Sequence, residues 1–113
     1  NDAAEEINGV KVVIKTFKDK TAEELRQMVD SLKDKLGSCV VVLASGEDKA
    51  VFAVGVTKDL IGKVKAGNLV KEAAQIAGGN GGGRPDFAQA GGKDASKIEE
   101  AVAKVRETLK TLL

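Results

Sequence analysis

The sequence contains no histidine, tryptophan or tyrosine, and it has only one cysteine, one methionine and one proline. Histidine is the commonest general base and the commonest metal ligand, so its absence removes the usual parts of a catalytic or metal site. A single cysteine cannot form an internal disulfide, and a zinc site here would have to be built from carboxylates, which is rare. Cys39 lies in an apolar run and is expected to be a buried thiol. The sequence therefore predicts no catalytic residues and no metal site.

Long apolar runs are also missing, so no segment reaches the roughly 18 residues of a membrane helix. The acidic start is unlike a secretory signal, and because it lacks methionine the chain is expected to be a piece of a longer protein. Three phenylalanines are the only aromatic residues, too few for a base-stacking platform. Any nucleic acid would be held through phosphates, sugars or shape.

What is present indicates one globular domain, with 42% hydrophobic and 31% charged residues in 113. The fold class is predicted as α/β (mixed α+β), a mixed sheet of four to five strands covered by helices in the order β-α-β-β-α-(β)-α. Capping boxes are predicted at Thr21 with Glu24 and at Ser96 with Glu99, and Asn68 is expected to open the middle helix. The expected elements are strands at 10–17, 39–44 and 50–56, helices at 21–37, 68–78 and 96–113, and a short edge strand at 86–91.

One stretch is unusually rich in glycine: seven of the fifteen residues from Gly78 to Gly92. Glycine permits positive φ and close approach of a ligand, and successive backbone N–H groups can form a nest that binds anions. Arg84 adds a planar cation suited to phosphate. The stretch is therefore predicted to be a phosphate-binding loop, with a flexible connector as the alternative. Asp86 is expected to be a turn residue or the partner of Arg84, and a general base is its alternative role.

Charge is distributed unevenly although the net charge is only +1. Residues 58–93 carry six basic and three acidic side chains, whereas the preceding part of the chain is net acidic. Lysines elsewhere, such as Lys33, are expected to be ordinary solvated residues. Within the basic segment acids are sparse, so its lysines are predicted to face a binding partner, with a solvated surface as the alternative. The lysines chosen on charge alone are Lys58, Lys63, Lys65 and Lys93.

The stretch "GGNGGGRPDFAQAGG" resembles the signature near the C-terminus of alanyl-tRNA synthetases, in a DHH-associated domain shared with DHH-family phosphoesterases. The resemblance extends over essentially the whole chain. Phe87 stands where the family pattern has methionine, which keeps the position apolar. The phosphoesterases commonly carry histidine after the glycine run. Arg84 stands there in this chain, which favours the synthetase branch.

This resemblance implies a non-catalytic domain, often called C-Ala, that binds the elbow of tRNA(Ala) and couples aminoacylation with editing. It implies that residues 9–113 form the globular domain and that residues 1–8 end a helical linker. The parent enzyme would attach alanine to tRNA with ATP, Mg and Zn, whereas this piece needs no cofactor. Other implied partners are the aminoacylation and editing domains and a second copy of the chain. The resemblance implies no membrane partner and a cytoplasmic location. The motif residues expected to contact RNA are Gly81, Gly82, Gly83 and Arg84.

Two alternatives remain open at this point. The chain also resembles the substrate-binding half of a DHH-type phosphoesterase, in which the same loop would hold a terminal phosphate. The last helix, which ends in "LKTLL", would instead serve as a dimerisation face if the domain were an oligomerisation module.

Overall fold

The fold is built on one six-stranded sheet, seen in a computed structural model that describes residues 4–113. The elements are β1 (Glu5–Ile7), β2 (Val10–Phe17), α1 (Ala22–Leu36), β3 (Cys39–Ser45), β4 (Ala50–Val56), the 3-10 helix η1 (Lys58–Leu60), α2 (Ala66–Ile76), β5 (Asn80–Gly83), β6 (Phe87–Gly92), the 3-10 helix η2 (Ala95–Lys97) and α3 (Ile98–Leu112). The strand order is β1-β2-β3-β4-β6-β5.

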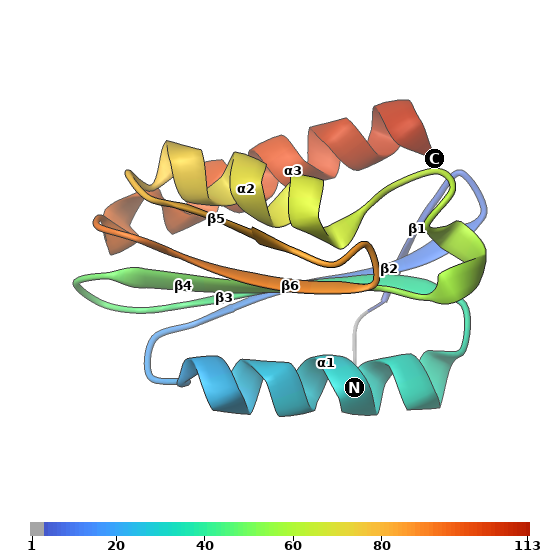
Figure 1. The fold of residues 1–113 in the computed structure, drawn as a ribbon, viewed down its shortest axis with the longest axis horizontal. Coiled ribbons are helices and arrows are strands. Elements are labelled where there is room, and N and C mark those ends of the chain that lie inside the picture. Colours follow the sequence, from blue (N-terminus) through green and yellow to red (C-terminus); the bar gives the residue numbers. More distant parts are fainter. Residues whose placement is uncertain (1–3) are drawn as a thin grey trace.

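The predicted mixed α/β class is confirmed, with helices on both faces of a mixed sheet (Figure 1). β2 and β3 are parallel and joined through α1, and β3 and β4 form an antiparallel hairpin, as the sequence predicts. α1 packs on β3 and β4 from one side, whereas α2 covers β4, β5 and β6 from the other and α3 lies beside α2. The two faces have separate apolar cores, here called the α1-side core and the α2–α3-side core.

The sheet has six strands instead of the predicted four to five, and one of the extra strands lies in the segment expected to end a helical linker. Glu5–Ile7 form β1, which pairs antiparallel with β2. Asn8 and Gly9 connect the two strands with φ values of 52° and 85°. Asn-Gly favours this kind of two-residue hairpin because both residues adopt positive φ readily. Residues 5–7 are therefore extended, and residues 1–3 of the expected linker lie outside the described part of the chain.

Cys39 is fully buried in the α1-side core. Burial raises the pKa of its thiol above the ordinary value, since the thiolate would lose its hydration. The prediction of a buried structural thiol is confirmed, and Cys39 is a poor nucleophile.

The predicted capping box at the start of α1 is confirmed. The Glu24 backbone N–H donates to Thr21 Oγ1 over 3.1 Å, and the Thr21 N–H donates to Glu24 Oε1 over 2.9 Å. We expect Thr21→Ala to lower the free energy of unfolding by about 1 kcal/mol, because a helix N–H loses its acceptor. Chemical denaturation measures this, with Ser96→Ala as the control, and equal losses in the two variants would contradict the capping role.

The same box makes the stabilisation contributed by Glu24 depend on pH. The hydrogen bond from the Thr21 N–H lowers the pKa of Glu24. A lowered folded-state pKa means that the ionised carboxylate stabilises the fold above its unfolded pKa and that this stabilisation is lost as pH falls through the folded pKa. The difference in free energy of unfolding between wild type and Glu24→Gln, whose side chain does not ionise, should therefore narrow in acid, and a difference that widens would be inconsistent with the box.

The starts of the other two helices differ from the predictions, one because a different local residue supplies the cap and the other because a distant residue does. The Ser96 N–H and hydroxyl both donate to Asp94 Oδ1, and Glu99 accepts a hydrogen bond from Thr16 instead of closing a capping box. α2 begins at Ala66, two residues before Asn68, and the Ala66 N–H donates to the carbonyl of Pro85 over 2.8 Å. A distant loop therefore caps α2.

Candidate nucleic-acid interface

The glycine stretch folds into a β-hairpin at the edge of the sheet. Asn80–Gly83 form β5, the outermost strand, and pair antiparallel with β6. The residues 84–86 make the tip of the hairpin. Because β5 is an extended strand, its N–H groups alternate between two directions and do not converge as an anion nest requires. The predictions of an anion nest and of a flexible connector are therefore both wrong. The predicted edge strand at 86–91 is instead an inner strand, β6, which lies between β4 and β5.

Most glycines of β5 are needed because the two strands of the hairpin lie unusually close together. A Cβ added at Gly81 would come within 2.2 Å of the Ala90 Cβ, and one at Gly83 within 2.7 Å of the Ala88 Cβ. Ordinary cross-strand Cβ atoms are about 4.5–5.5 Å apart. Gly82 differs, since a Cβ there would meet nothing within 4 Å and its φ is not positive. The packing of the hairpin gives no reason for glycine at position 82.

The hairpin tip is held by three separate elements. The Pro85 carbonyl accepts from the first N–H of α2, and the Asp86 carbonyl accepts from the Val56 N–H at 2.9 Å and from Lys33 Nζ at 3.4 Å. Arg84 Nε lies 3.3 Å from Asp86 Oδ1, while 71% of the Arg84 side chain is exposed. Asp86 is thus the partner of Arg84, as predicted. The arrangement presents a guanidinium to solvent from a fixed backbone.

Three of the four predicted lysines lie at the same end of the sheet as this tip. Lys58 follows β4, whose last residue donates to the Asp86 carbonyl. Lys63 and Lys65 precede α2 and line a groove of about 320 Å³ that also contacts α3. The Lys65 ammonium donates to the Ile61 carbonyl over 3.1 Å. These two lysines therefore belong to the side of the domain covered by α2 and α3.

Lys93 is not brought to this end. It follows the last residue of β6, and its Cβ lies 3.7 Å from where a Cβ of Gly78 would be. The six residues of β6 separate it from the tip by about 20 Å. Lys93 and Arg84 therefore lie at opposite ends of the hairpin.

Two cations near the tip were missed by the sequence analysis. The Arg26 guanidinium lies 5.6 Å from the centroid of the Phe87 ring, and Lys33 donates to the Asp86 carbonyl. Both come from α1 and are seven residues apart, so they lie on one flank of the helix, the flank toward β6. That spacing is visible in the sequence, but nothing local shows which neighbour the flank faces.

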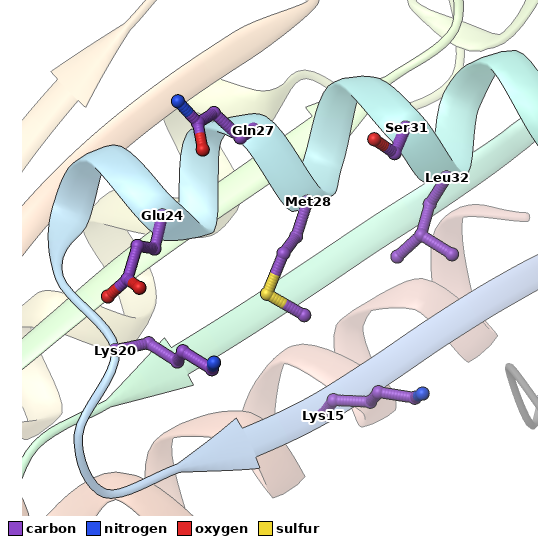
Figure 2. A pocket seen from close by; sticks show the side chains of 7 residues that line it. All are labelled: Lys15, Lys20, Glu24, Gln27, Met28, Ser31 and Leu32. Carbon is purple, nitrogen blue, oxygen red and sulfur yellow. The ribbon is translucent and has the colours of Figure 1, made fainter.

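Other features of the described part of the chain offer little chemistry. No group of three or more His, Cys, Asp or Glu residues within residues 4–113 is arranged to hold a metal. A groove of about 370 Å³ lies between α1 and β2 (Figure 2). Met28 and Leu32 point into it from α1, and Lys15 and Lys20 lie across from them. Over the same residues, no helix is both long and apolar enough to span a membrane.

The apolar face of the last helix is part of the α2–α3-side core. Ile98, Val105 and Leu109 are buried there. Leu112, 45% exposed, is the large apolar side chain that stands out as exposed within residues 4–113. The apolar stripe that would have served as a dimerisation face is therefore packed inside the domain except at Leu112.

Comparison with known proteins gives consistent matches over almost the whole chain. Residues 9–111 match the DHHA1 domain family. The chain is 59% identical over 109 residues to the alanine–tRNA ligase of Fusobacterium nucleatum, covering 96% of this chain and 13% of that protein. It is 53% identical over 110 residues to the Bacillus subtilis alanine–tRNA ligase, covering 96% and 12%. The chain thus spans only about an eighth of the length of these relatives.

Two solved structures share the fold. The crystal structure of the C-Ala domain of Aquifex aeolicus alanyl-tRNA synthetase has a TM-score of 0.87 and 36% identity, covering 95% of this chain and 97% of that one. A DHH-domain protein described as a member of a ribosomal protein family has a TM-score of 0.65 at 15% identity, covering 93% and 26%, which shows a common fold alone. With the family match and the Aquifex aeolicus domain both spanning nearly its full length, this chain belongs to the DHHA1 domain family, in the branch formed by the C-Ala domains of alanyl-tRNA synthetases.

Proposed function

We propose that this domain is a non-catalytic tRNA-binding module of an alanine–tRNA ligase. It binds the elbow of tRNA(Ala), so that one tRNA can serve both the aminoacylation and the editing domains of the same chain. The parent enzyme uses ATP with Mg and Zn in its other domains, and acts in the cytoplasm. The identity to alanine–tRNA ligases over 96% of the chain supports this assignment.

The observation that carries the proposal is the hairpin tip. Arg84 is exposed, yet the carbonyls of the two residues after it accept hydrogen bonds from α2, β4 and α1, which hold the backbone there in place. A guanidinium on a fixed backbone loses little entropy when it binds a phosphate, and its planar fork suits two phosphate oxygens. Lys58, Lys33 and Arg26 lie around the same tip and add positive charge for a polyanion.

Replacing Arg84 by alanine tests this assignment. We expect the affinity of the domain for a tRNA(Ala) transcript to fall about five- to tenfold at low salt, because one charge-assisted contact is lost. Arg84→Lys should recover part of the affinity, since the charge remains without the fork geometry. Fluorescence anisotropy titration measures the dissociation constants.

Lys104→Ala is the matched control, because Lys104 is an exposed cation on α3, away from the hairpin. Equal affinities of wild type and Arg84→Ala would remove the tip from the binding surface. A wild-type domain that does not bind tRNA would refute the proposed function itself. Sedimentation of the free domain would show whether a second copy takes part.

A further inference from the structure

We propose, resting on the tRNA-binding function above, that the RNA lies on the side of the β5–β6 hairpin that faces α1. In this arrangement the sugar–phosphate backbone passes directly over Gly82, with Arg26 on one side and Arg84 on the other. This surface, here called the hairpin face, consists of Arg26, Lys33, Gly82, Arg84, Phe87 and Gln89.

The alternation of β6 places these residues on one face. Ala88 and Ala90 are buried in the α2–α3-side core, whereas Phe87 packs against the α1-side core. Gln89 therefore points to the α1 side as well, and its Nε2 donates to the Ala22 carbonyl at the start of α1 over 2.8 Å. Gly82 pairs with Gln89, so its open position lies on the same face.

Gly82 is the residue of β5 at which the RNA backbone would come closest to the protein backbone. A Cβ at either neighbouring glycine of β5 would clash with β6, whereas position 82 is open and its backbone needs no positive φ. Glycine inside a strand weakens it, since it adds backbone entropy and no packing. A bare backbone on an edge strand lets a ribose or phosphate approach the peptide plane directly. Contact with a ligand accounts for a glycine that the fold does not require.

The charges around Gly82 match a polyanion. Arg26 and Lys33 border the hairpin face on the α1 side and Arg84 borders it at the tip. The carboxylate at the tip, Asp86, pairs with Arg84. Asp30 lies on α1 between the two cations, four residues after Arg26. The positive groups thus outnumber the negative ones on this surface, as an RNA backbone requires.

Phe87 adds a partly exposed aromatic ring beneath Arg26. The ring packs on the α1-side core and the guanidinium lies over it at 5.6 Å. A cation placed over an aromatic ring is held by the π electrons while its N–H groups remain directed outward. Arg26 is thereby held over the first residue of β6, the strand that pairs with β5.

The opposite side of the hairpin is covered by α2, and the groove between α2 and α3 on that side of the domain is a less suitable surface for RNA. There Lys65 already donates to the Ile61 carbonyl, and Glu72, which accepts from Thr108, lies in the same groove as Lys63 and Lys65. A carboxylate in the groove repels phosphate. The two sides of the domain therefore differ in charge, and changing one charge on each side tests where the RNA binds.

The test compares three variants of the 113-residue chain in titrations with a tRNA(Ala) transcript. An Aquifex aeolicus domain of nearly the same extent was solved as a separate chain, so the domain folds by itself. We expect Gly82→Val to weaken binding at least tenfold, since its side chain fills the approach. Arg26→Glu should weaken binding about tenfold and reduce the slope of log K against log salt by about one to two. Lys63→Glu makes the same change of charge on the other side and should weaken binding less than threefold.

Thermal melting must show the Gly82→Val fold intact, which is expected because valine favours strands. If that variant does not fold, the comparison of Arg26→Glu with Lys63→Glu decides alone. Full affinity in Gly82→Val or Arg26→Glu, or a larger loss in Lys63→Glu, would overturn the hairpin face while leaving tRNA binding intact. Failure of the wild-type chain to bind would refute both the site and the function.

Discussion

Replacing Gly81 by alanine is expected to destabilise the domain by about 2 kcal/mol, although the change adds one methyl group to an exposed strand. The added Cβ would lie 2.2 Å from the Ala90 Cβ and 2.8 Å from its Cα. These atoms belong to the backbone or are fixed to it, so no rotamer change relieves the contact. The two strands must separate, which weakens the hairpin that caps α2 through Pro85.

Thermal melting measures this effect, as a fall in the midpoint of roughly 10 °C for a domain of this size. Gly82→Ala is the matched control, because it makes the same change one residue along the same strand where nothing lies within 4 Å. The control should melt at the wild-type temperature or slightly above. Similar midpoints for the two variants would show that β5 and β6 are not held as closely as described.

The second large effect is on salt dependence. If Arg26, Lys33, Lys58 and Arg84 each contact a phosphate, the slope of log K against log salt is about −3.6, and raising salt from roughly 50 to 200 mM weakens binding about a hundredfold. Little of the affinity then comes from apolar contacts, consistent with only three phenylalanines in the chain. Anisotropy titrations at several salt concentrations give the slope.

The variant Arg84→Ala serves as the internal standard, since loss of one phosphate contact should lower the magnitude of the slope by about one. A slope near zero for the wild type would mean that binding does not depend on phosphate contacts. A slope that is steep but unchanged in Arg84→Ala would place the phosphates elsewhere on the domain.

The regular elements were predictable because their signals are local. The run of β-branched residues in β2, the continuous apolar run of β3 and the capping box of α1 each depend on residues close in sequence. The left-handed Gly78 after α2 was likewise predictable, with φ at 80°. The Asn8-Gly9 hairpin carries an equally local signal, although residues 1–8 were predicted to end a helical linker.

The misses have a common cause in contacts between distant residues. α2 starts at Ala66 because Pro85 accepts its first N–H, and no feature of residues 65–68 shows this. The run 80–83 became a strand because β6 offered a partner, although glycine disfavours strands. The sequence predicts no strand at 80–83 because glycine has a low strand propensity. Pairing with β6 outweighs that propensity in the folded domain.

The sequence by itself determined the fold class, the covering of the sheet by helices, and the family to which the chain belongs. It also determined the burial of Cys39 and the pairing of Arg84 with Asp86. The tertiary structure alone decided how the charges are grouped. It brought Arg26 and Lys33 of α1 to Phe87 and Asp86 at the hairpin tip, and it placed Lys93 at the far end of β6. It also left free space beside Gly82, whereas Gly81 and Gly83 lie close against β6. The physical reason is that charge and glycine content are properties of single residues, whereas proximity and free space arise only when strands and helices pack.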